Sequence, residues 1–195
     1  GLSIFFIKCD VAIDKQTKEL NVRDIDGNSY KCVKLDNIWM SENLKVTHYR
    51  NGDSIPQVQG LNEWFKAKEG AWCYNTDSAL SGVKKVMLYN WYAVNDPRGL
   101  APEGFHIPSN EEFRQLKIYL GESHGVLLKS NNGWKEQGSG NNKTGFNASP
   151  VGIRFMDKPI SYIGYSTGWW TNSENYEKWA LYSFLHYNFN DMETA

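Results

Sequence analysis

The sequence predicts an α+β fold, and three observations lead to this prediction. One strongly signalled amphipathic helix follows Ser109, several short aromatic segments alternate with the two-residue period of strands, and clusters of Gly, Pro, Asn and Asp separate them. The elements come in the order β, short α, β, long capped α, long loop and several β, which is typical of α+β rather than alternating α/β proteins. With 195 residues and 41% hydrophobic content, the chain is long enough for one domain with its own core.

The first strands are predicted from alternation around turn-forming residues. Residues 20–22 and 31–35 are strand-like, and the Asp, Gly and Asn of residues 24–28 favour a tight turn between them. Residues 44–48 alternate in the same way before a second turn at residues 51–53. We therefore expect an early hairpin followed by a further extended segment.

A short helix and two strands are predicted next. Residues 61–68 have apolar side chains at helical spacing and are followed by Gly70, a residue that favours a helix end. Residues 71–74 resume strand character, and the alternating aromatics of residues 89–94 predict an aromatic strand. A loop rich in Pro and Gly, residues 97–104, follows this strand.

The main helix has a clear start and end. Ser109 and Glu112 have the spacing of a capping box, and Gly121 suits the backbone turn that ends a helix. The side chains on one stripe of this helix are Phe113, Leu116, Lys117 and Leu120. This stripe predicts that the helix packs against the aromatic sheet.

The remainder of the chain is predicted as one long loop and a meander of strands. Residues 123–145 are polar and rich in glycine and asparagine, which indicates a loop. Residues 146–155 and 162–165 suggest short strands, and a longer pair is expected from residues 168–171 and 179–187.

Charge and cysteine content exclude some classes of function. The net charge of −1, the isoelectric point near 6.5 and the absence of a basic run argue against nucleic acid as a partner. Cys9, Cys32 and Cys73 lack the paired spacing of a zinc site. They leave room for one disulfide and an odd thiol, with Cys9 as the candidate for the odd one.

Residues 1–19 form an N-terminal segment, and residues 20–195 are expected to form the single domain. The apolar run before Cys9 is too short to span a bilayer. It is either the end of a clipped lipoprotein signal, with Cys9 as the lipidated residue, or a first strand in which Cys9 packs. Lys8 stands where such a signal usually has a small residue, and both interpretations remain open.

Three phrases of the sequence resemble a known family. They are DIDGNSYKCVKLDNIWMSENLKVTHYRNGDSIP at residues 24–56, LYNWYAVNDPRGLAPEGFHIPSNEEF at residues 88–113 and GFNASPVGIRF at residues 145–155. WWTNSE at residues 169–174 also looks like the last aromatic strands of that family. Together they resemble the Fibrobacter succinogenes major paralogous domain. The resemblance implies a C-type-lectin-like fold with mixed and antiparallel sheets, on a scaffold similar to that of sulfatase-modifying factors. It also implies an extracellular or outer-surface location, with lipid anchoring through Cys9 where that residue is modified, and brings no shared catalytic chemistry.

The chain departs from the family pattern at its end. Family members usually continue with a closing strand after the last aromatic strand, whereas residues 190–195 read NDMETA. We therefore expect an open sheet edge, which residues 3–7 or a second chain would pair.

No catalytic residue, metal or cofactor is predicted. His48, His106, His124 and His186 are scattered, without a nucleophile or carboxylate at a suggestive spacing. Sulfatase-modifying factors need two reactive cysteines late in their fold, but all three cysteines here lie in the first half. The tripeptides that hold calcium and sugar in lectins of this superfamily do not occur.

The predicted function is a non-enzymatic binding module for a polysaccharide or surface glycoprotein. The candidate ligand-binding residues combine flat aromatic rings with polar groups, and they are Trp134, Trp169, Trp170, Asn172, Glu174, Tyr176, Trp179 and His186. Because Trp169 and Trp170 are neighbours on a strand, only one of the two is expected to face a ligand. The alternative is a structural or assembly domain that docks another copy or a larger surface protein through a sheet edge.

Overall fold

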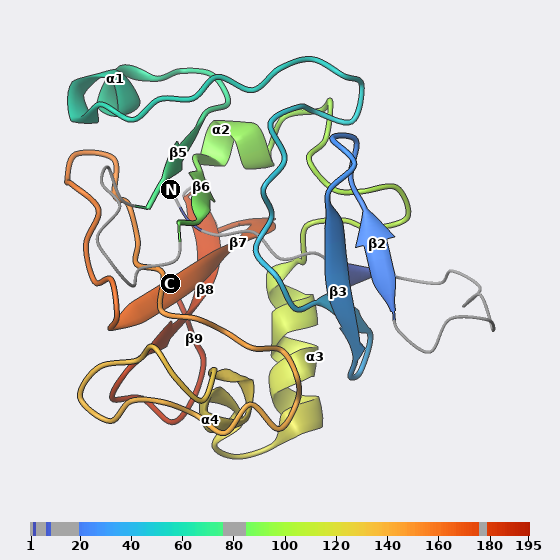
Figure 1. Cartoon of the computed structure of the whole chain (residues 1–195), viewed down its shortest axis with the longest axis vertical. Helices are drawn as coiled ribbons and strands as arrows, with labels where there is room; N and C mark the ends of the chain where they lie inside the picture. Colours follow the sequence, from blue (N-terminus) through green and yellow to red (C-terminus); the bar gives the residue numbers. More distant parts are fainter. Residues whose placement is uncertain (1, 3–6, 9–19, 76–84, 176–178) are drawn as a thin grey trace.

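A computed structural model describes residues 2, 7–8, 20–75, 85–175 and 179–195 (Figure 1). The strands in these ranges are β1 Ile7–Lys8, β2 Asn21–Arg23, β3 Ser29–Lys34, β4 Ile38–Met40, β5 Trp72–Tyr74, β6 Met87–Tyr89, β7 Ser166–Glu174, β8 Ala180–His186 and β9 Glu193–Thr194. The helices are α1 Leu61–Lys66, α2 Trp91–Val94, α3 Asn110–Leu120 and α4 His124–Leu128. This mixture of helices and antiparallel sheets confirms the predicted α+β class.

The described strands form three separate sheets, in the orders β1-β4-β3-β2, β5-β6 and β7-β8-β9. The predicted hairpin is the antiparallel pair β2 and β3, with Val22 opposite Tyr30. Asp24 holds its turn, because the carboxylate accepts hydrogen bonds from the backbone N–H of Asn28 and the hydroxyl of Tyr30. The local turn chemistry read from the sequence is therefore what forms this element.

An aromatic core lies where α3 meets the sheets. Trp39 of β4 packs against Phe113 of α3 and against Phe146, with ring centroids 5.2 and 6.1 Å apart. Phe146 in turn meets Trp169 of β7 edge to face at 5.6 Å. All four side chains are fully buried. Figure 1 shows α3 running beside β7 and β8, so this one helix joins the first and last sheets through aromatic rings.

The capping box at the start of α3 is confirmed. The Ser109 hydroxyl accepts from the backbone N–H of Glu112 at 3.1 Å, and the Glu112 carboxylate accepts from the backbone N–H of Ser109 at 2.7 Å. The helix ends at Gly121, whose φ of 76° suits a residue without a Cβ. Phe113 and Leu116 are buried, as their stripe predicted.

The capping carboxylate makes stability depend on pH. Burial alone would raise the pKa of Glu112, but hydrogen bonds from His106 and Ser109 lower it from 4.5 to about 2. A lowered pKa in the folded state contributes stability that is present above pH 4.5 and is lost as the pH falls toward 2. We expect the urea midpoint to fall across this window, and Glu112→Gln, which keeps an acceptor but does not titrate, to flatten part of the decline. Equal slopes for the two proteins would contradict this role of Glu112.

The predicted aromatic strand at residues 89–94 is wrong after its first residue. β6 ends at Tyr89, and Trp91–Val94 forms the helical turn α2. Asn90 causes the change, because its side chain accepts from the backbone N–H of Ala93 and so starts a helix.

Three other predicted elements also differ. The long loop at residues 123–145 contains the short helix α4. Residues 146–155 form isolated bridges instead of a strand, such as those of Gly152 with Thr167 and Ile153 with Ser161, and residues 162–165 form a turn. Left-handed backbone at Asn147 and Tyr162 interrupts continuous pairing there.

The predicted open edge is also wrong. β9 pairs with β8 through Ser183–Thr194 and Phe184–Glu193, and Ala195 exchanges two backbone hydrogen bonds with Tyr182. The NDMETA residues close this edge by backbone pairing, which their side chains did not signal. β1 pairs with β4 and not with β8.

Predictions about Cys9 fall outside the described residues. The lipidation of Cys9 and the alternative role of Cys9 as an odd thiol therefore stay predictions. Within the ranges that the structure describes, no helix has the length and apolar character needed to cross a membrane.

Candidate functional site

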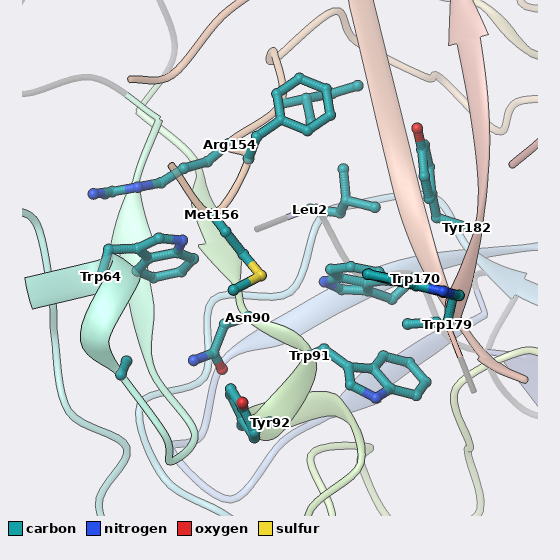
Figure 2. Close-up of a pocket in the computed structure, with 14 residues that line it drawn as sticks. Leu2, Trp64, Asn90, Trp91, Tyr92, Arg154, Met156, Trp170, Trp179 and Tyr182 are labelled. Atoms are coloured by element: carbon teal, nitrogen blue, oxygen red, sulfur yellow. The ribbon is translucent and has the colours of Figure 1, made fainter. Parts of the chain in front are cut away.

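A cavity of about 310 Å³ opens between α1, α2, the segment 153–156 and the end of the β7–β8 pair (Figure 2). Its described lining includes the aromatic side chains Trp64, Trp91, Tyr92, Phe155, Trp170, Trp179 and Tyr182. Leu2 and Met156 add aliphatic surface, and Arg154 is the charged residue among the described lining. We call this cavity the aromatic pocket.

Asn90 positions the two aromatic residues of α2. Its side-chain oxygen accepts from the backbone N–H groups of Ala93, at 3.0 Å, and Ala71, at 2.9 Å. Its amide nitrogen donates to the carbonyl of Glu69 at 2.9 Å. One buried side chain therefore starts α2 and ties it to the segment before β5, which places Trp91 and Tyr92 at the pocket.

The sheet wall of the pocket is an aromatic row. Trp170 of β7 lies opposite Tyr182 of β8, with ring centroids 6.1 Å apart and nearly perpendicular planes. Trp91 approaches Trp170 from α2 at 5.4 Å. The Trp170 indole N–H donates to the carbonyl of Tyr89 at 2.9 Å, which fixes the orientation of its ring. The row is therefore preorganised by contacts made within the protein.

Trp179 stands at the rim of the pocket. Its side chain is among the most exposed large apolar groups, at 67%. Its backbone is held by Asn175, because the Trp179 N–H donates to the Asn175 side chain and the Asn175 N–H donates to the Trp179 carbonyl, both at 2.9 Å. An exposed indole on a fixed backbone is suited to contact a ligand.

The opposite wall is organised by Arg154. This residue is buried, donates to the carbonyls of Gln59 and Gly60 at 2.9 and 3.0 Å, and lies over the Trp64 ring at 4.5 Å. These contacts hold the segment that carries Met156. Figure 2 shows the Met156 thioether pointing into the space between Trp64 and Trp170. Methionine in this place gives the pocket an adaptable apolar surface.

Two of the predicted ligand-binding residues, Trp170 and Trp179, lie at the pocket. Trp169 is only 1% exposed and belongs to the core, so the prediction that neighbouring Trp169 and Trp170 face opposite sides is confirmed. Trp134 is also buried, and its indole N–H donates to Ser130 and Ala148. Trp134 and Trp169 therefore present no ring face to a ligand, because their rings fill the core.

The other predicted residues are placed around or away from the pocket. Glu174 pairs with Ala180, which lines the pocket, while Asn172 is exposed and donates from its backbone to Pro108. His186 lies six residues along β8 from Ala180, roughly 20 Å at the usual strand rise. Its ring packs against Phe189, outside the pocket lining. Tyr176 falls outside the described residues.

Sequence reasoning missed five aromatic residues of the pocket lining, namely Trp64, Trp91, Tyr92, Phe155 and Tyr182. The sequence did contain a signal for Trp91 and Tyr92. Asparagine directly before the Trp-Tyr-Ala run is a helix start, and a helical turn would have set Trp91 and Tyr92 on one protruding element.

Acidic and imidazole groups do not gather at the pocket. The His–carboxylate pairs among the described residues are His48–Asp26, His106–Glu112 and His124–Asp191, at 2.6, 2.7 and 3.2 Å. None of these residues is in the described pocket lining. Groups of three or more metal-ligating side chains are not found in the described ranges.

The family model of the Fibrobacter succinogenes major domain matches residues 35–192, which is most of the chain. The protein belongs to this family. No curated protein and no solved structure matches the chain. The match to the Fibrobacter succinogenes major domain includes α1, α2, β7 and β8. All described lining residues of the aromatic pocket except Leu2 therefore lie within the matched range.

Proposed function

We propose that this family member is a non-enzymatic binding module that takes a sugar ring of a polysaccharide or glycoprotein into the aromatic pocket. The observation that carries the proposal is the convergence of seven aromatic side chains on one small cavity, with Trp179 exposed at its rim. Such a concave apolar site with a few polar groups is the usual form of a ligand pocket.

The chemistry of a pyranose fits this lining. One face of the ring presents C–H groups, which pack on the flat faces of Trp and Tyr, and the hydroxyls at its edge need hydrogen-bonding partners. Tyr92 and Tyr182 are the described lining residues that carry phenol hydroxyls. The volume of about 310 Å³ lies at the small end of the usual range of about 300–1,000 Å³. We therefore expect one ring or one chain end to enter.

The charge of the described lining favours a neutral sugar. Arg154 is its charged member, and the guanidinium already donates to the carbonyls of Gln59 and Gly60. A charged sugar would have to leave water for a surface made mainly of aromatic and aliphatic carbon, which is costly without paired partners.

We further propose a C-type-lectin-like arrangement of the elements and a location at the cell exterior or outer surface. Among the described residues, the one long helix packed on antiparallel sheet, the long loops and the pairing of β9 with β8 support this arrangement. Anchoring through a lipid on Cys9 is the corresponding proposal for attachment. Mass measurement of the mature protein from its native host tests it, and an unmodified Cys9 would remove it.

Trp179 provides the most direct test of the sugar site. We expect Trp179→Ala to weaken binding of the best neutral oligosaccharide found on a glycan array by at least tenfold, about 1.4 kcal/mol, because an exposed rim indole supplies stacking area. Titration calorimetry measures the loss.

The matched control is Tyr119→Ala on α3, which removes another exposed aromatic ring that does not line the pocket. This variant should bind as the unmodified protein does. The proposal fails if no neutral glycan binds, or if Trp179→Ala and Tyr119→Ala lose affinity equally.

A further inference from the structure

Met156 differs from the other methionines of the chain in its exposure to solvent. The sequence contains four methionines, and the structure describes all of them. Met156 is 59% exposed, whereas Met40, Met87 and Met192 are 0, 5 and 2% exposed. A dissolved oxidant therefore reaches the Met156 thioether in the folded protein and is kept from the other three.

The segment that carries Met156 is anchored before this residue and exposed from there on. Arg154 is buried and donates hydrogen bonds to the carbonyls of Gln59 and Gly60. Residues 155–159, which follow this anchor, are all exposed. The anchor keeps Met156 beside the aromatic pocket, and the exposed segment lets another protein approach its side chain.

Oxidation of Met156 would change the chemistry of the pocket itself. Its thioether lies in the space between Trp64 and Trp170, as Figure 2 shows. Hydrogen peroxide transfers one oxygen atom to such a sulfur: the O–O bond breaks, an S–O bond forms, the thioether is oxidised to a sulfoxide and the peroxide is reduced to water. A polar sulfoxide then replaces an adaptable apolar group.

We propose that Met156 is a site of reversible oxidation by hydrogen peroxide, and that its sulfoxide weakens binding in the aromatic pocket. The effect on sugar affinity rests on the proposed sugar site, whereas the selective oxidation does not. A sulfoxide oxygen holds water, and removing that water is costly, so a ring bound between Trp64 and Trp170 loses apolar contact. Methionine sulfoxide reductases restore the thioether, and the exposure of residues 155–159 gives them access.

The oxidation site is tested on the full chain without any ligand. Under limiting hydrogen peroxide, peptide mass mapping should show sulfoxide forming about tenfold faster at Met156 than at Met40, Met87 or Met192. Circular dichroism checks that the oxidised protein is folded. The two methionine sulfoxide reductases, one for each sulfoxide epimer, should together remove the added oxygen. Equal oxidation of all four methionines in the folded protein, or a sulfoxide that the reductases leave in place, would overturn the site.

The effect on the pocket is measured with two probes, the neutral oligosaccharide used for Trp179→Ala and the neutral apolar dye N-phenyl-1-naphthylamine. Oxidised protein should bind both about fivefold more weakly, the order of effect of one lost apolar contact. Met156→Leu keeps an apolar side chain without sulfur, so its affinities should not respond to peroxide.

The two probes separate this proposal from the sugar site. Unchanged affinity of the fully oxidised protein for the dye and the sugar would overturn the effect on binding, and so would an equal response of Met156→Leu. If the dye responds to oxidation but no neutral glycan binds the reduced protein, the sugar site fails and the oxidation-sensitive pocket stands.

Discussion

Replacing Asn90 with alanine is expected to lower the free energy of unfolding by about 3 kcal/mol, because two buried backbone N–H groups and one backbone carbonyl lose their hydrogen-bond partner at once. The N–H groups of Ala71 and Ala93 and the carbonyl of Glu69 all bond to this side chain. Urea unfolding followed by circular dichroism measures the loss. Because Asn90 starts α2, any ligand that binds beside Trp91 and Tyr92 should lose affinity in the same variant.

Two variants make this test specific. Asn90→Asp keeps an acceptor for the two N–H groups but sets a carboxylate oxygen against the Glu69 carbonyl, so its loss should be smaller than that of Asn90→Ala. Asn131→Ala, at an exposed loop position, should change stability by less than about 0.5 kcal/mol. An unchanged urea midpoint for Asn90→Ala would show that α2 forms without its cap.

Phe146→Ala is expected to cost about 3–5 kcal/mol, since it removes a fully buried ring and leaves a cavity. The ring bridges Trp39 of the first sheet and Trp169 of the last, so both contacts are lost in one substitution. Thermal melting should show a midpoint several degrees lower, and urea unfolding should give the free energy.

Phe146→Leu is the matched core variant, because it keeps much of the buried volume and should cost less than Phe146→Ala. Phe65→Ala removes the same side chain from an exposed place on α1 and should change stability by less than about 0.5 kcal/mol. If Phe146→Ala and Phe65→Ala destabilise equally, the aromatic contacts do not hold the sheets together as we describe.

The two faces of β7 have different roles, and this shows how the fold supports the pocket. The aromatic core of Trp39, Phe113, Phe146 and Trp169 lies on one face of β7, and the pocket residue Trp170 lies on the other. One strand therefore serves both core and pocket through its two-residue alternation. Pocket variants such as Trp179→Ala can change binding with little effect on folding, whereas core variants change both.

Elements whose signals are local could be predicted from the sequence. The capping box of Ser109 and Glu112 and the turn at Asp24 depend on side chains that bond to backbone within a few residues. The opposite orientation of Trp169 and Trp170 follows from strand geometry in the same way. Neighbouring residues determine these features, so reading them needs no knowledge of the rest of the fold.

Elements whose partners are distant could not be predicted in the same way. Alternating aromatics at residues 89–94 satisfy a strand pattern, but the chain leaves β6 after Tyr89 and the Asn90 cap on Ala93 starts a helix, which the distant Asn90 bonds to Glu69 and Ala71 hold in place. The pairing of β9 with β8 likewise uses backbone groups that every sequence carries. Propensity over such short stretches is weak, and tertiary contacts override it.

The sequence by itself determined the family, the α+β class, the one long helix and the tryptophan-rich strand pair that carries Trp170 and Trp179. The tertiary structure decided which aromatic rings line the pocket and which fill the core. It buried Trp134, gathered Trp64, Trp91 and Tyr182 around one cavity, and seated Leu2 against Tyr89. The reason is physical: caps and turns are made within a few residues, whereas a pocket exists only where segments far apart in the chain pack together.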